Sequence, residues 1–155
     1  MSDQRFLTEI ESLSMALADK TRLRLLNLMR GQEICVCFFT EILEESQPKV
    51  SRHLAYLRTS GLVEARRDGK WMHYRIAEHA SNDVNRILEE VLERLALHPE
   101  MQAERARYNE MCCSPEMLVQ IARTPIDFLT EDTSDVGHRV GIVEPAHNEL
   151  EEFLL

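Results

Sequence analysis

The four cysteines of this 155-residue chain are its residues best suited to chemistry, and they fall into two pairs. One valine separates Cys35 from Cys37, and Cys112 is adjacent to Cys113. Thiolates are the ligands that soft metal ions prefer. The first pair lies shortly before a stretch that has the pattern of a DNA-binding helix. The two features together predict a repressor whose binding to DNA depends on a ligand.

Each pair also has a simpler interpretation. Cysteine is among the most frequently buried residue types, so Cys35 and Cys37 could be small core hydrophobes. A vicinal pair such as Cys112-Cys113 is by itself a weak signal. On a regular helix, residues i and i+2 point about 200° apart, so Cys35 and Cys37 cannot hold one ion there. We therefore expect their backbone to be extended, or to unwind when a ligand binds.

The DNA-binding pattern starts at Gln47 and Pro48. A short helix over about 37–45, a turn, and a helix that begins at Pro48 and ends near 60–61 form a helix-turn-helix. We expect Arg52 to bond guanine, Gln47 to bond adenine, and Lys49 to bind phosphate. The complete set expected to contact DNA from this helix is Gln47, Lys49, Ser51, Arg52, His53 and Tyr56.

A basic hairpin follows this helix. Segments 62–66 and 71–76 resemble strands, and Asp68-Gly69 between them is a typical hairpin turn. Residues 48–76 carry seven Lys and Arg against two acids, although the whole chain has a net charge of −9. We expect Arg66, Arg67 and Lys70 to contact phosphate or the minor groove. An ordinary solvated charged face is the competing interpretation of these residues.

Further helices are expected to complete the fold. Apolar spacing predicts helices over 6–17 and 20–30, with Asp19 as N-cap and Gly31 after the end of the second. A long apolar stripe predicts another helix that ends near Pro99. This stripe either covers the core or pairs with a second subunit, and we favour pairing. The residues expected at the subunit contact are Leu7, Ile10, Val84, Ile87, Leu88, Val91, Leu92 and Leu95.

The expected organisation is one domain with an extension and a tail. Residues 1–98 form the winged helix-turn-helix and dimerisation domain, mainly α with a β-hairpin wing. Residues 99–123 form a helical extension, and residues 124–155, with eight acids against one arginine, form a flexible tail. The sequence shows no signal peptide and no apolar run that would span a membrane. We expect a cytoplasmic protein with reduced thiols and no membrane partner.

Three motifs resemble the ArsR–SmtB metal-responsive repressors over about residues 5–97. They are Leu17-Ala18-Asp19-Lys20-Thr21-Arg22-Leu23-Arg24-Leu25-Leu26, Gln47-Pro48-Lys49-Val50-Ser51-Arg52-His53-Leu54 and Gly61-Leu62-Val63. Glu33-Ile34-Cys35-Val36-Cys37 resembles the thiolate box of that family. The resemblance implies a homodimer that represses transcription from operator DNA until a metal or metalloid binds. A dimer of this kind predicts an inverted-repeat operator.

The resemblance is incomplete at the thiolate box. Phe38 replaces an aspartate, and Thr40 stands where the arsenic sensors place a third cysteine. Cys112 or Cys113 offers a replacement, so the expected ligands of trivalent arsenic or antimony are Cys35, Cys37 and one of that pair. A site made by Cys112 and Cys113 alone, suited to an organoarsenical such as methylarsenite, stays open. The zinc-sensor pattern is missing, since Asn85, Ala96 and Pro99 stand at its ligand positions.

The favoured function is a repressor that trivalent arsenic or antimony releases from DNA. The alternatives are the same repressor sensing cadmium or lead, and a thiol redox sensor in which Cys112 and Cys113 oxidise. An enzyme is not expected, because the chain has five glycines, no glycine-rich phosphate loop and no Cys-x-x-Cys motif. No catalytic cofactor is expected either.

Overall fold

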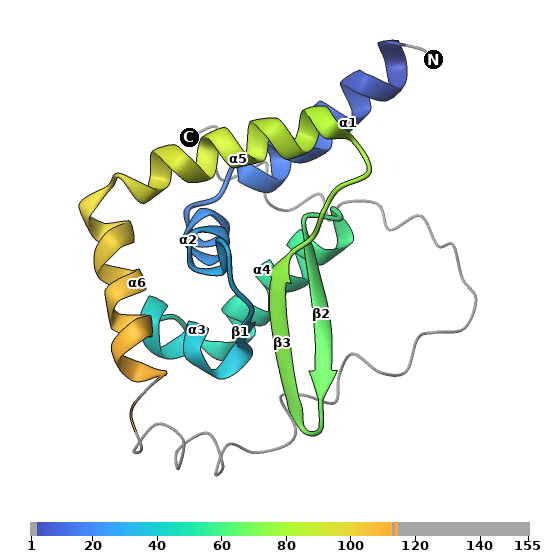
Figure 1. Cartoon of the computed structure of the whole chain (residues 1–155). Coiled ribbons are helices and arrows are strands. Elements are labelled where there is room, and N and C mark those ends of the chain that lie inside the picture. The colour runs from blue at the N-terminus through green and yellow to red at the C-terminus, as the bar shows by residue number, and fades with distance from the viewer. Residues whose placement is uncertain (1–2, 113, 115–155) are drawn as a thin grey trace, which may run out of the picture.

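The structure is a computed structural model that describes residues 3–112 and 114 (Figure 1). Its helices and strands, in chain order, are α1 (Asp3–Leu17), α2 (Lys20–Met29), β1 (Ile34–Cys35), α3 (Val36–Leu43), α4 (Gln47–Thr59), β2 (Val63–Asp68), β3 (Trp71–Ile76), α5 (Asn82–Ala96) and α6 (Pro99–Met111). The succession α3, turn, α4 and hairpin is a winged helix-turn-helix, as predicted. Residues 113 and 115–123 of the expected helical extension, and the acidic tail, lie outside the described residues.

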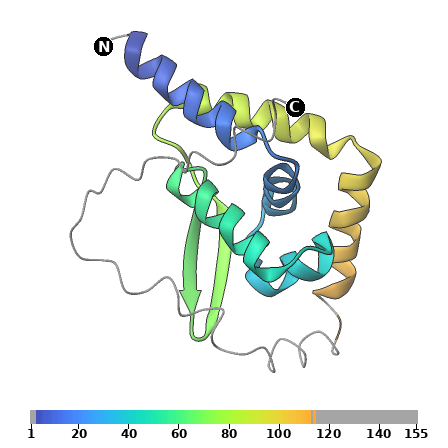
Figure 2. The same cartoon turned by 180° about the vertical axis from the view of Figure 1, so that it is seen from behind.

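Helix α2 is the centre of the core. Leu25, Leu26 and Leu28 on this helix have no exposed surface, and Phe39 of α3 and Leu57 of α4 are buried to the same degree. Helices α1 and α5 lie side by side across one end of the molecule, and α6 runs down one side (Figures 1 and 2). In the view from behind, α4 crosses the front of the molecule (Figure 2). The core thus supports α4 from one face only.

The sheet has three antiparallel strands in the order β1-β3-β2. Strands β2 and β3 form the predicted hairpin, with Asp68 opposite Trp71 and Gly69 in the turn at φ 60°. The two-residue strand β1 adds to the other edge of β3 and pairs Cys35 with His73. Sequence patterns did not predict β1, because two residues are too short to show an alternation. It joins the first cysteine pair to the wing.

Local signals placed the helix ends to within about three residues. The Asp19 carboxylate accepts a hydrogen bond of 2.9 Å from the backbone N–H of Arg22, so it is the predicted N-cap of α2. Gly31, just past the end of α2, has φ 71°, a conformation that glycine adopts without steric cost. Pro48 is the second residue of α4, one position later than expected, and α5 ends at Ala96, shortly before Pro99, which begins α6. Each of these signals acts within one turn of the chain.

The expected subunit contact needs correction. Val84, Leu88 and Leu92 were expected to face a second subunit, but they are buried in the core of their own chain, where α5 packs on α1, α2 and α6. Leu7 and Ile87 stay exposed, at 61% and 40%. Ile10, Val91 and Leu95 are half-buried, and the apolar side chains of Phe6, Met15 and Leu97 are exposed as well.

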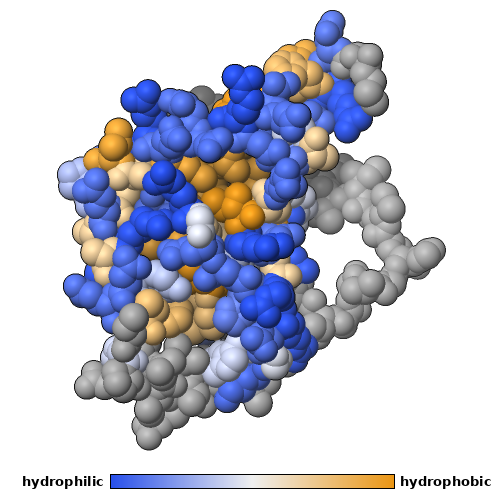
Figure 3. Space-filling model, viewed as in Figure 1, coloured by the Kyte–Doolittle hydropathy of each residue, from blue (hydrophilic) through white to orange (hydrophobic). Residues whose placement is uncertain are grey.

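Part of the molecular surface beside α5 is apolar. On the face shown in Figure 3, apolar residues in orange gather among hydrophilic side chains beside α5. No helix within the described residues is both long enough and apolar enough to cross a membrane.

Candidate functional site

The first cysteine pair lies where an extended strand turns into a helix. Cys35 ends β1 with φ −66° and ψ 136°, and Cys37 is the second residue of α3. The Cys37 thiol donates a hydrogen bond to the Cys35 sulfur, with the two Sγ atoms 3.0 Å apart. Of the two conformations expected for this segment, the structure therefore has the extended one. Both sulfurs can face one ligand without unwinding of the helix.

This hydrogen bond changes the acidity of both thiols. Hydrogen bonding from Cys37 stabilises the Cys35 thiolate and lowers the pKa of Cys35 from 9.0 to about 7. The same interaction, together with burial, raises the pKa of Cys37. A pair that loses its first proton near neutral pH and keeps the second is a ready nucleophile toward a thiol-seeking ion.

The surroundings connect this pair to the wing. Cys35 is 7% exposed and belongs to the hydrophobic core, and Cys37 is half-buried beside it. Glu33, two residues before Cys35, accepts hydrogen bonds of 2.9 and 2.6 Å from the Arg66 guanidinium on β2. Its carboxylate also lies 3.8 Å from the Nδ1 atom of His73 on β3. Arg66 is the main reason for the lowered pKa of Glu33.

The second pair is only partly described. Helix α6 packs on α3, with the Tyr108 ring edge-on to Phe38 at 5.3 Å between centroids. Cys112 caps the end of α6, is half-buried, and its thiol donates to the Asn109 carbonyl at 3.4 Å. Cys113 lies outside the described residues. Within 3–112 and 114, no three His, Cys, Asp or Glu side chains gather as a metal site, so Cys112 does not join Cys35 and Cys37 in one group.

Helix α4 presents most of the expected DNA-contacting residues to solvent. Gln47, Ser51, Arg52 and Tyr56 are exposed. Lys49 is half-buried, and its ammonium forms an ion pair of 2.8 Å with Glu45 in the preceding turn. Hence the first turns of α4 offer polar and positive groups, in agreement with the expected outer face.

His53 is the exception on α4. The side chain is 8% exposed and faces the N-terminus of α2, so its expected place on the outer face is wrong. The sequence contained the signal, because His53 follows the inward-facing Val50 by three residues and precedes Leu57 by four. Its polarity obscured its position in this apolar stripe.

The wing carries its expected cations. Arg66, Arg67 and Lys70 are exposed, and each also has a partner within the chain. Arg66 binds Glu33, and Arg67 donates to the Gly69 carbonyl at 3.0 Å. The Lys70 ammonium lies 4.9 Å from the centre of the Trp71 ring. These contacts hold the wing tip in shape and leave its positive charge at the surface.

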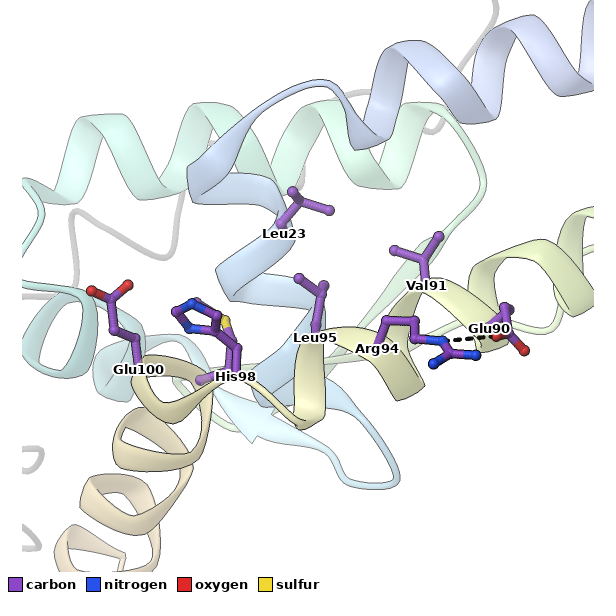
Figure 4. Close-up of a pocket in the computed structure, with 8 residues that line it drawn as sticks. Leu23, Glu90, Val91, Arg94, Leu95, His98 and Glu100 are labelled. Carbon is purple, nitrogen blue, oxygen red and sulfur yellow. Dashed lines mark hydrogen bonds and ion pairs between the residues drawn. The ribbon is translucent and has the colours of Figure 1, made fainter.

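The structure adds a groove that sequence patterns did not predict. It lies between α2, α5 and α6 and encloses about 470 Å³ (Figure 4). Leu23, Val91, Leu95 and Met101 form its apolar wall, while charged side chains such as Arg94 stand at its edge. Val91 and Leu95 belong to the expected subunit contact, so the groove borders that surface.

Comparisons with known proteins agree with the winged helix-turn-helix fold. Residues 19–65 match the family described as "Bacterial regulatory protein, arsR family". The chain is 46% identical over 86 residues to the "Arsenical resistance operon repressor" of Escherichia coli K12, covering 55% of this chain and 73% of that protein. It is also 46% identical over 78 residues to the "Arsenic resistance transcriptional regulator ArsR1" of Pseudomonas putida KT2440, covering 50% and 61% respectively.

Two solved structures resemble the fold. HlyU from Vibrio cholerae N16961 aligns with a TM-score of 0.53 and 31% identity, over 63% of this chain and all of that one. The homodimeric winged helix-turn-helix domain of Mb0332 from Mycobacterium bovis aligns with a TM-score of 0.51 and 32% identity, over 64% and 91%. These alignments cover about two thirds of this chain at most.

Proposed function

We propose a function that proceeds from the family of this chain. The chain belongs to the arsR family of bacterial regulatory proteins. The fold and the relatives are those of DNA-binding transcriptional repressors and not of enzymes. Its repressor function follows from that membership. What we add is the signal: the protein releases its operator when Cys35 and Cys37 capture trivalent arsenic or antimony through their thiolates.

The contact between the two sulfurs carries this proposal. Sulfur atoms 3.0 Å apart, one of them with a pKa lowered to about 7, form a donor pair that suits a soft, thiol-seeking ion. A pair of buried structural cysteines needs neither the short contact nor the lowered pKa. The names of the relatives, which refer to arsenic resistance, support the choice of metalloid.

We propose Cys112 or Cys113 as the third ligand. Cys112 follows the Tyr108 turn that packs against Phe38, close to the start of α3. Closing a three-thiolate site would require the end of α6 to move toward Cys37, or a contribution from a second subunit. The dithiol of Cys35 and Cys37 provides the first two bonds in either case.

The position of the thiols suggests how a ligand would act on DNA binding. Cys35 pairs with the wing strand β3, and Cys37 lies in the first turn of α3, the helix before α4. An ion bonded to both sulfurs would fix the angle between β1 and α3. The conformation that the ion favours would place the wing and α4 differently and would therefore bind DNA more weakly. Linkage then requires that DNA weaken the binding of the ion by the same factor.

The proposed DNA complex uses two surfaces of each subunit. The N-terminal residues of α4, Arg52 and Gln47 above all, enter the major groove, and the wing cations Arg66, Arg67 and Lys70 bind adjacent phosphate. A homodimer would present two copies of this surface, which calls for an inverted-repeat operator.

A release experiment tests this function. The operator is first selected from random duplexes with the wild-type protein at low salt. Arsenite, antimonite, methylarsenite, cadmium, lead, zinc and peroxide are then titrated against the complex. We expect release by arsenite and antimonite, and none by zinc. Cys35→Ser with Cys37→Ser should bind the operator normally and resist release.

Single variants at the second pair complete the design. If Cys112→Ser or Cys113→Ser raises the arsenite concentration needed for release, that residue is the third ligand. Release by peroxide at concentrations where arsenite has no effect would identify a redox sensor instead. Arsenite release that survives loss of both Cys35 and Cys37 would refute the proposed site.

A further inference from the structure

Arg22 is a residue that the proposed DNA complex does not use, yet it joins three helices. Its Nε atom donates to the Ala16 carbonyl at 2.8 Å and its Nη2 atom to the Met15 carbonyl at 2.9 Å. Both carbonyls belong to the last turn of α1, where acceptors lack an intrahelical i+4 partner, although Met15 also accepts from the backbone N–H of Ala18 at 3.3 Å. One planar guanidinium thus caps α1 from a position on α2.

The same guanidinium also reaches the DNA-reading helix. Its central carbon lies 4.3 Å from the centre of the Tyr56 ring, and its Nη1 atom lies 3.5 Å from Nδ1 of His53. His53 and Tyr56 are one turn apart on α4, so both face Arg22. A lysine cannot reproduce this set of contacts, because it lacks the flat fork that bonds two carbonyls and stacks on a ring together.

The contact to His53 depends on the charge of the imidazole. A neutral ring with an unprotonated Nδ1 accepts a hydrogen bond from Arg22. A protonated ring has N–H groups on both nitrogens, so Nδ1 can no longer accept and becomes a donor. The Asp19 carboxylate lies 3.6 Å from the same Nδ1 atom and would then receive that proton's hydrogen bond. Protonation therefore exchanges Arg22 for Asp19 as the partner of α4.

We propose that Arg22 is a positioning residue that sets the DNA-reading helix against α1 through His53 and Tyr56, and that protonation of His53 breaks this link and weakens operator binding. Operator binding should thus fall in mild acid without any change at the thiols. The inference rests on the DNA-binding part of the proposed function and not on the metalloid site.

The charges around His53 favour the neutral ring near neutral pH. Burial is the largest influence and lowers its pKa below the ordinary 6.5, since the charged form loses hydration. On α2, Asp19 raises this pKa and Arg22 lowers it; on α4, Arg52 and Lys49 lower it. Glu45 in the turn between α3 and α4 is a further acid near the ring. The cationic neighbours and burial outweigh the acids.

Binding of the selected operator is measured against pH in three proteins: wild type, His53→Gln and Arg22→Lys. Glutamine can still accept from Arg22 but does not titrate in this range. For wild type we expect an affinity loss of about two- to fivefold between about pH 7.5 and about pH 5.5, because a pKa below 6.5 leaves His53 only partly protonated at the acid end. The affinity of His53→Gln should change much less over the same range.

Arg22→Lys should bind about tenfold more weakly at about pH 7.5 and lose most of the pH dependence. The matched controls are His98→Gln and Arg86→Lys, both at exposed positions on or near α5. Size-exclusion chromatography and thermal melting establish that each variant folds and assembles like wild type.

Nuclear magnetic resonance of the wild-type imidazoles tests the same link without any substitution. If protonation of His53 weakens operator binding, linkage requires that operator DNA lower the pKa of His53. Because this measurement uses wild-type protein, it remains valid even where a variant fails to fold. An unchanged or raised His53 pKa in the complex would overturn the inference, as would equal pH profiles of wild type and His53→Gln. Failure to select any operator would instead count against the proposed function.

Discussion

At the scale of single residues, short polar contacts define the chemistry of this protein. The hydrogen bond between Cys37 and Cys35 makes one thiol acidic and the other reluctant to ionise. A second polar contact, between Arg22 and His53, ties the reading helix to its support. Both contacts depend on a single proton, so both can be examined by titration.

The acidity of Cys35 is predicted to depend on its partner. Cys37→Ala removes the donor that stabilises the Cys35 thiolate, so the pKa of Cys35 should rise from about 7 toward its ordinary 9.0. The measurement is a pH titration of thiolate ultraviolet absorbance, in protein that carries Ser at positions 112 and 113. A midpoint that does not move would show that the hydrogen bond is absent in solution.

His53 is predicted to make folding stability depend on pH. Its pKa is lower in the folded state than the ordinary 6.5, so the unfolded chain binds more protons as the pH falls through that value. The free energy of unfolding should therefore decrease from about pH 7.5 to about pH 5.5. Urea denaturation should show a smaller decrease in His53→Gln, while exposed His98→Gln should match wild type. Equal decreases in all three proteins would contradict this account.

At the scale of elements, α6 is hydrogen-bonded to the ends of α2 and α3. Arg105 donates to the Asn27 and Arg30 carbonyls at the end of α2, at 2.9 and 3.0 Å. Arg107 donates to the Ile42 and Glu41 carbonyls near the end of α3, at 3.2 and 3.1 Å. These arginines add hydrogen bonds to carbonyls near the ends of α2 and α3, where i+4 partners run out, and the Asn27 carbonyl accepts from the backbone N–H of Arg30 as well. The extension is thus part of the fold that positions α3.

An ion pair between α2 and α6 is predicted to stabilise the fold. Glu104 is 8% exposed, and its Oε1 atom accepts from Nε of Arg24 on α2 at 2.6 Å. Glu104→Ala leaves Arg24 without this partner and should destabilise the fold by about 2–3 kcal/mol, below the value for a fully buried pair because Arg24 is partly exposed. Glu110→Ala, at an exposed position on the same helix, is the control. Equal unfolding midpoints in urea would disprove a structural role for the pair.

At the scale of the whole molecule, the expected DNA-binding surface and the expected subunit contact lie on different elements. The basic residues expected to contact DNA lie on α4 and the wing, whereas most of the exposed aliphatic side chains lie on α1 and around α5. The groove beside Val91 and Leu95 adjoins the latter surface. A second copy of the chain covering α1 and α5 would leave both basic surfaces open to DNA.

The predicted homodimer can be tested at one exposed position. Ile87→Glu places a charge in the expected contact, where its desolvation opposes association, so the protein should become monomeric at micromolar concentration. Loss of the second reading helix should weaken operator binding by about a hundredfold. Analytical ultracentrifugation and operator titration measure the two effects, with Ala106→Glu at an exposed position of α6 as control. A dimer of unchanged stability would exclude this surface.

The sequence alone determined the features that depend on neighbouring residues. Asp19, Gly31, Pro48 and the Asp68-Gly69 turn act through backbone conformation and local hydrogen bonds, so they placed the helix ends and the hairpin correctly. The family resemblance is of the same kind, because its motifs are contiguous.

Only the tertiary structure decided which side of each element is covered. It turned His53 inward, buried Val84 within its own subunit, and added β1 to the wing. It also brought the sulfurs of Cys35 and Cys37 within 3.0 Å, because pairing with β3 keeps Cys35 extended where α3 begins. These outcomes depend on contacts between segments far apart in the chain, and local sequence patterns do not contain that information.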